Sequence, residues 1–114
     1  MGIATVFAHV SCSDVEVSAP WYEKLFARPP GRRPMPTVAE WQFSDSAEVQ
    51  LNQNRKDAGH STLTLGVLPL EPEWVRLDKA GLLPGAIEKK DGYFIMCLYD
   101  PDGNLVVFAS AKRN

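Results

Sequence analysis

The chain has 114 residues, of which 45% are hydrophobic and 23% charged, and its formal net charge is −2. This length fits one domain, residues 1–114, that buries about two-thirds of its unfolded surface. Without a basic excess or stripe, nucleic acid is not expected as a partner. No apolar run approaches about 18 residues and no signal-peptide pattern opens the chain, so we expect a cytoplasmic protein without membrane contact. Cys12 and Cys97 form no CxxC pair, which favours reduced thiols over a disulfide scaffold.

Residues 3–12 predict a strand, because small and apolar side chains recur at every second position. One face of this strand carries Val6, Ala8, Val10 and Cys12. The opposite face carries Phe7, His9 and Ser11 and would point into whatever the sheet encloses. The first face is therefore expected to pack beneath a helix.

A helix is expected next, since Ser13-Asp14 offers an N-cap and Val17, Trp21 and Leu25 recur at helical spacing. Pro20 lies deep for a helix start, so we expect the regular helix to begin near Ser18. Four prolines within residues 28–36 then predict a loop.

The rest of the first half predicts strands at 38–44 and 47–52 around an Asp45-Ser46 turn, with one further short strand in the region 34–38. A polar linker follows at 54–59. The second half repeats the order, with a strand at 61–68, a helix at 71–80 that stops at Gly81, and strands at 84–90, 93–99 and 105–111. Asp91-Gly92 predicts a type I′ hairpin turn.

The last hairpin carries a distinctive turn, Asp100-Pro101-Asp102-Gly103-Asn104, followed by a run of apolar residues. This stretch, together with the helix end Trp21-Tyr22-Glu23-Lys24-Leu25-Phe26, resembles the vicinal oxygen chelate superfamily of glyoxalases, extradiol dioxygenases and bleomycin-resistance proteins. The resemblance implies an α+β fold of two tandem βαβββ modules, residues 1–54 and 60–114, forming a curled mixed sheet around a cleft. It also implies a homodimer, which exposed apolar surface on a half-open sheet favours independently.

The metal-dependent members of this superfamily hold a metal at four positions, and the resemblance places these positions at Phe7, Gln50, Thr62 and Val107. Phenylalanine and valine cannot bind a metal, and the other two are weak neutral ligands. We therefore expect no metal and no cofactor. The alternative is an unorthodox metal site built from His9, His60 and Glu48.

If the strand alternation holds, the predicted cleft is lined by ten residues: Phe7, His9, Ser11, Trp41, Phe43, Gln50, Asn52, Thr62, Thr64 and Val107. Two orientations are open for this strand. In the favoured one, Trp41 and Phe43 point into the cleft. In the other, both rings pack under the first helix and Gln42 lines the cleft instead. Aromatic walls with a few amides and hydroxyls suit a flat or amphipathic organic molecule.

Three functions remain open. The favoured one is a metal-free binding protein of the glyoxalase/bleomycin-resistance type that sequesters a hydrophobic or aromatic compound or an antibiotic. The second is a lyase, isomerase or dioxygenase with displaced metal ligands, or with His9 as a general acid–base. The third is a protein-interaction module whose groove is filled by its own side chains.

Overall fold

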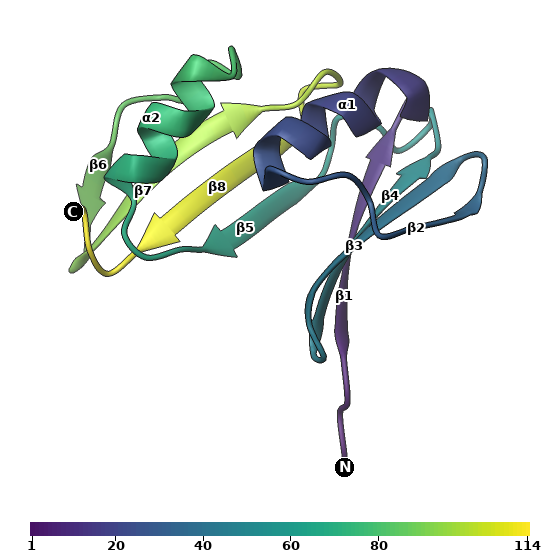
Figure 1. Ribbon diagram of the computed structural model, residues 1–114, viewed down its shortest axis with the longest axis horizontal. Helices are drawn as coiled ribbons and strands as arrows, with labels where there is room; N and C mark the ends of the chain where they lie inside the picture. The colour runs from purple at the N-terminus through teal and green to yellow at the C-terminus, as the bar shows by residue number, and fades with distance from the viewer.

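The computed structural model describes all 114 residues and contains two four-stranded sheets, one from each half of the chain (Figure 1). The first half forms β1 (Val6–Cys12), α1 (Val15–Phe26), β2 (Arg32–Met35), β3 (Val38–Ser44) and β4 (Ala47–Gln53). The second half forms β5 (Thr62–Gly66), α2 (Glu71–Lys79), β6 (Glu88–Lys90), β7 (Tyr93–Tyr99) and β8 (Leu105–Ser110). The strand orders, β1-β4-β3-β2 and β5-β8-β7-β6, are the same in both sheets, which confirms the α+β fold of repeated βαβββ units.

Each sheet is mixed in the same way. Its first strand runs parallel to its last, and the other pairings are antiparallel. The first strands of the two sheets, β1 and β5, are neighbours, and α1 lies over the junction while α2 covers the second sheet (Figure 1). The N-terminal part of β1 and the tip of the β3–β4 hairpin project away from the rest of the molecule. Neither helix is long and apolar enough to span a membrane.

Helix α1 begins earlier than the sequence indicates. The Asp14 side chain accepts a hydrogen bond from the Glu16 amide at 3.0 Å and thereby caps a helix that starts at Val15. The expected start near Ser18 is therefore wrong, and Pro20 lies inside the helix on its exposed side. Because proline has no backbone N–H, Pro20 removes one helical hydrogen bond. This bond lies close to the helix N-terminus, where the Asp14 cap already stabilises the helix.

Two strand boundaries also differ from expectation. The proline-rich segment contains β2, a short exposed edge strand that pairs with β3, where a loop over 28–36 and a strand at 34–38 were expected. Pro34 is tolerated there because proline lacks a backbone N–H, and a strand at the edge of a sheet has backbone positions that need no hydrogen bond to a neighbouring strand. The strand expected from residue 84 begins only at Glu88. The type I′ turn is consistent with positive φ at both Asp91 and Gly92.

A buried hydrogen-bond network joins the two halves of the chain at the Asp100–Asn104 turn. The Asp100 carboxylate accepts hydrogen bonds from the Tyr22 hydroxyl at 2.7 Å, the Asn104 side chain at 2.8 Å and two backbone amides of the turn. Asn104 in turn donates to the Ser11 carbonyl at 2.8 Å and accepts from the Ser61 amide at 2.9 Å. One turn therefore fixes the end of β1, helix α1 and the start of β5 together; we call it the joint network.

The neighbouring Asp102 extends the joint network to the β1–α1 connection. Its carboxylate accepts hydrogen bonds from the Ser13 amide at 3.0 Å and from the Ser13 hydroxyl. The linker before β5 passes so close to this turn that a Cβ on Gly59 would lie 2.7 Å from the Asp102 carbonyl oxygen. Gly59 also has φ +86°, so this position requires glycine for both space and conformation.

Two ionisable groups pack against the joint network and keep their protons. Burial, and then the Asp100 charge, raise the pKa of the Tyr22 phenol above its ordinary value. Burial, with a contribution from Asp102, raises the pKa of the Cys12 thiol from 9.0 to about 11. Both groups are therefore neutral wherever the fold is intact near neutral pH.

We predict that Asp100→Ala lowers the free energy of unfolding by about 3 kcal/mol, because it leaves several buried donors without an acceptor. Tyr22→Phe removes only one of these donors and should cost about 1 kcal/mol. Chemical denaturation measures both. The exposed Asp78→Ala serves as control with a change below about 0.5 kcal/mol. An Asp100→Ala effect no larger than this control would contradict the role given to the network.

We further predict that stability falls as the pH rises from about 9 towards 11, the interval between the ordinary and folded pKa values of Cys12. In this interval the unfolded chain has lost the thiol proton while the folded chain retains it, so ionisation favours unfolding. Denaturation at a series of pH values should show that the free energy of unfolding declines less for Cys12→Ala than for the unmodified protein. The comparison extends to about pH 10, where tyrosine begins to ionise in the unfolded chain. Equal declines in the two proteins would exclude Cys12 as the cause.

Candidate functional site

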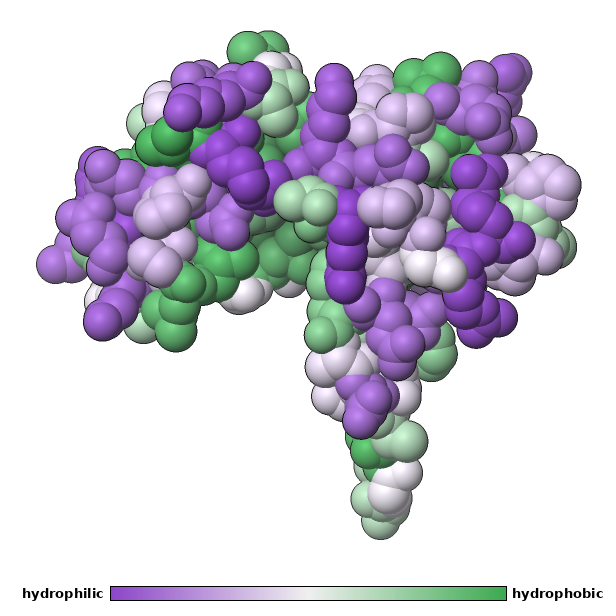
Figure 2. Space-filling model, viewed as in Figure 1, coloured by the Kyte–Doolittle hydropathy of each residue, from purple (hydrophilic) through white to green (hydrophobic).

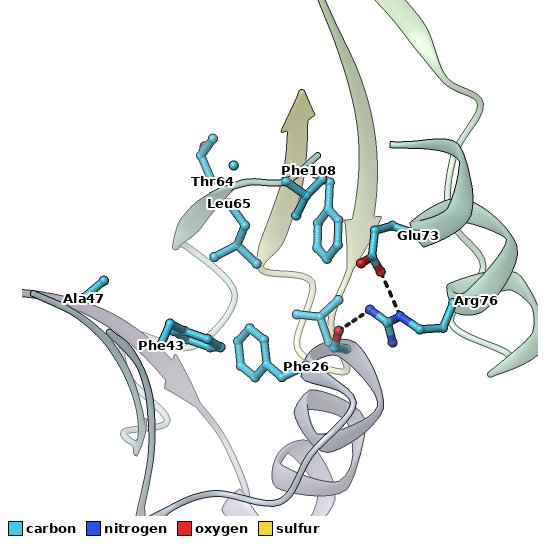
Figure 3. A pocket seen from close by; sticks show the side chains of 11 residues that line it. Phe26, Phe43, Ala47, Thr64, Leu65, Glu73, Arg76 and Phe108 are labelled. Atoms are coloured by element: carbon cyan, nitrogen blue, oxygen red, sulfur yellow. Dashed lines mark hydrogen bonds and ion pairs between the residues drawn. The ribbon is translucent and has the colours of Figure 1, made fainter. Parts of the chain in front are cut away.

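The largest cavity, about 430 Å³, lies in the angle between the two sheets, on the side that carries the helices (Figure 3). Five segments enclose it: the C-terminal end of α1, the β3–β4 hairpin, β5 with the residues after it, α2 and β8. It is lined by Leu25, Phe26, Phe43, Ala47, Thr64, Leu65, Gly66, Val67, Glu73, Arg76 and Phe108. We call this the inter-sheet cavity. Figure 2 shows hydrophobic residues gathered in the same angle of the molecule.

Aromatic rings form one wall of the inter-sheet cavity. Phe26 and Phe43 meet edge to face with their ring centroids 4.9 Å apart, and Phe26 also packs on Trp41 at 5.3 Å. The Arg28 guanidinium lies 4.8 Å above the Phe43 ring, a cation–π contact that holds the ring at the cavity edge. Leu65 and Phe108 of the second sheet face these rings in Figure 3. The walls thus offer apolar and aromatic surface to a ligand.

An ion pair at the α2 end of the cavity also connects the two helices. Arg76 donates to Glu73 at 2.8 Å and, through its two other nitrogens, to the carbonyls of Lys24 and Leu25 at 2.7 Å each. These carbonyls belong to the last turn of α1, which has no further intrahelical donors for them. Because the guanidinium is engaged in this way, it acts as a structural clamp at the cavity rather than a free anion-binding group.

Eight of the predicted cleft residues lie on the sheet faces that point away from the helices, in two groups, and one of them, Thr64 on the outermost strand β5, also lines the inter-sheet cavity. On the first sheet, His9 is in register with Gln50 and Ser11 with Asn52, and Phe7 follows on the same face of β1. On the second sheet, Thr64 is in register with Val107, and Thr62 shares their face. No cavity brings the two groups together, so their role in ligand binding stays a prediction.

The predicted direction of Trp41 and Phe43 is wrong. Trp41 is 1% exposed, packs on Tyr22 and Phe26 of α1, and donates from its indole nitrogen to the Arg28 carbonyl at 3.0 Å. Phe43 lies on the same helix side, where it lines the inter-sheet cavity. The open face at this point carries Gln42 instead, the alternative left open by the sequence. The reason is that a bulky buried helix face needs bulky partners beneath it.

The positions that hold the metal in the resembled superfamily do not fit a metal here. Phe7 and Val107 carry no donor atom, and Gln50 is already hydrogen-bonded to Glu40. The alternative set is not assembled either, because no group of three or more His, Cys, Asp or Glu side chains is placed to hold a metal ion. His60 lies exposed in the segment before β5, away from the strand faces of His9 and Glu48.

Sequence reasoning identified only Phe43 and Thr64 among the residues of the inter-sheet cavity. Leu25 and Phe26 were recognised as the apolar stripe of a helix, and Leu65 and Phe108 as strand residues. Nothing local distinguishes them from ordinary core residues, because the cavity arises where five segments of the chain leave a space. The Glu73–Arg76 pair at helical spacing gave no signal beyond a solvated helix face.

The comparisons with known proteins agree on the fold. No known family model matches the sequence, and no curated protein matches it. The structure of a glyoxalase/bleomycin resistance protein from Catenulispora acidiphila superposes with a TM-score of 0.87 at 26% identity, covering 94% of this chain and 97% of that one. TnmS3, an antibiotic binding protein from Streptomyces sp. CB03234, gives 0.81 at 18% identity, covering 96% and 98%. A lactoylglutathione lyase from Agrobacterium tumefaciens gives 0.80 at 10% identity, covering 96% and 94%.

Proposed function

We propose that this chain, which has the glyoxalase/bleomycin-resistance fold of the vicinal oxygen chelate superfamily, binds a small apolar or aromatic molecule, such as an antibiotic. The observation that carries this proposal is the inter-sheet cavity. Its volume of about 430 Å³ falls within the range of small-molecule sites, roughly 300–1,000 Å³. Its aromatic wall supplies contact area, and its single ion pair is already satisfied internally.

Two further observations support binding over metal-dependent catalysis. The residues at the four superfamily metal positions do not form a set of metal ligands. They would therefore not hold the metal ion that acts as the Lewis acid in the superfamily's enzymes. TnmS3, whose structure superposes over nearly the whole chain, is an antibiotic binding protein. The lyase shares the same fold, so an enzymatic function with displaced ligands remains the alternative that the experiment must distinguish.

We predict that the fluorescent probe 1-anilinonaphthalene-8-sulfonate binds the protein with a Kd of about 10 µM and is displaced by a small aromatic antibiotic. Ala47→Trp places a large ring at the cavity and should weaken probe binding about tenfold or more. The control is Lys56→Trp, at an exposed position outside the cavity. Fluorescence titration measures all three proteins.

Equal probe binding by Ala47→Trp and the unmodified protein would overturn the cavity as the binding site. The same titration is repeated with EDTA and with added Zn²⁺. The proposal expects no change with either. Stoichiometric zinc accompanied by turnover of a small substrate would favour the enzymatic alternative.

We also propose that the protein is a homodimer. The start of β1 and the residues before it expose Ile3, Val6 and Phe7, which are between 55% and 69% exposed, and such apolar surface favours association. Phe7→Glu should weaken the dimer at least about tenfold, because it places a charge in the interface. Val17→Glu, on α1 and equally exposed, should not. Sedimentation equilibrium decides, and a monomer at all concentrations would contradict the proposal.

A further inference from the structure

A small polar hollow lies on the open face of the first sheet, opposite to the inter-sheet cavity. It has a volume of about 120 Å³, and none of its lining residues is hydrophobic. They are Gly31, Arg32, Glu40, Gln42 and Glu48. Strand pairing explains how they meet: Arg32 is in register with Glu40, and Gln42 with Glu48. We call this the acidic hollow.

Glu40 is a buried carboxylate with one oxygen left without a partner. The residue is 7% exposed, although it sits on a face that is otherwise open. Its Oε2 accepts a hydrogen bond from the Gln50 amide, but its Oε1 is buried and accepts none. A buried unsatisfied oxygen on a charged group is costly, so native proteins rarely keep one without a reason.

Arg32 approaches this oxygen without satisfying it. Its Nε lies 3.6 Å from Oε1, too far for a hydrogen bond, and its side chain is 72% exposed on the edge strand β2. The contact is therefore a weak, solvent-screened ion pair. With Glu48 on the same rim, the hollow carries two carboxylates against one guanidinium.

The chemistry of the hollow selects its occupant. Two carboxylates and no further charged ligand fall short of the donor set for a divalent cation, consistent with the absence of any three-residue metal group. An ammonium group, by contrast, needs three acceptors, and two carboxylates with the side-chain amide oxygen of Gln42 are acceptors of the right kind. The volume suits a head group of a few heavy atoms rather than a whole drug molecule.

We propose that the acidic hollow is a binding site for a primary ammonium group, with Glu40 Oε1 as its principal acceptor. The incoming ammonium takes the place that Arg32 holds only loosely, and Glu48 adds a second negative charge. The site lies on the opposite face of the first sheet from the inter-sheet cavity and does not depend on the function proposed for that cavity.

The test uses propylammonium chloride as probe in an NMR titration of the backbone amides of Gly31 and Arg32 and the side-chain amide of Gln50. Saturable shifts with a Kd on the order of 10 mM are expected for a ligand of this size. Two probes serve as comparisons. 1-Propanol has the same size without charge, and tetramethylammonium has the charge without N–H donors; both should bind at least about tenfold more weakly.

Matched substitutions assign the binding to the hollow. Glu40→Gln keeps the size of the side chain and should weaken propylammonium binding about tenfold or more. Arg32→Ala removes the competing cation and should strengthen it about threefold. The controls Glu88→Gln and Lys89→Ala make the same changes of charge at exposed positions of β6 and should leave the affinity unchanged.

Thermal unfolding first establishes that Glu40→Gln folds. If it does not, Arg32→Ala carries the test, because it alters only an exposed side chain. Equal shifts with 1-propanol, or an affinity unaffected by both substitutions, would overturn the proposal. Ala47→Trp should leave propylammonium binding intact, so a failure of the inter-sheet cavity as a ligand site would not be confused with a failure of the hollow.

Discussion

The carboxylate of Asp100 is the point on which the two halves of this protein depend. It is 5% exposed and receives hydrogen bonds from the helix of the first half and from the turn of the second. No cation neutralises it, so its burial is compensated only by these donors. Because hydrogen bonds fix both distance and direction, the network sets the positions of β1, α1 and β5 more sharply than apolar packing alone would do.

This arrangement determines where the candidate sites lie. The sheets meet at the joint network and diverge from it, and the space between the β3–β4 hairpin and β5 becomes the inter-sheet cavity. Arg76 closes the helix side of that space by binding the last carbonyls of α1. The cavity is therefore a consequence of how the two halves are joined.

The two faces of the first sheet have become chemically different. The helix side gathers Trp41, Phe26 and Phe43 around apolar space, whereas the open side gathers carboxylates and amides around Glu40. Alternation along β3 produces both, since Glu40 and Gln42 point one way and Trp41 the other. The two candidate sites, the inter-sheet cavity and the acidic hollow, thus lie on opposite faces of the same strand.

The order of strands and helices followed from the sequence alone, because alternating apolar positions, helical spacing and the turn residues of Asp91-Gly92 and Asp100–Asn104 act locally. The sequence alone also shows that Phe7 and Val107 offer no ligand atom to a metal, because neither side chain has one in any conformation. The sequence did not decide the start of α1, where a side-chain cap outweighed Pro20, or the direction of Trp41, which depends on the helix packed above it.

Only the tertiary structure revealed the inter-sheet cavity and the unsatisfied oxygen of Glu40. Both depend on which residues distant in the chain meet, and on the space or the donors that remain when they do. A glutamate in a strand looks like any solvent-facing residue until its neighbours cover it. Local patterns therefore specify the elements of this protein, while the chemistry of its surfaces is set by the packing between those elements.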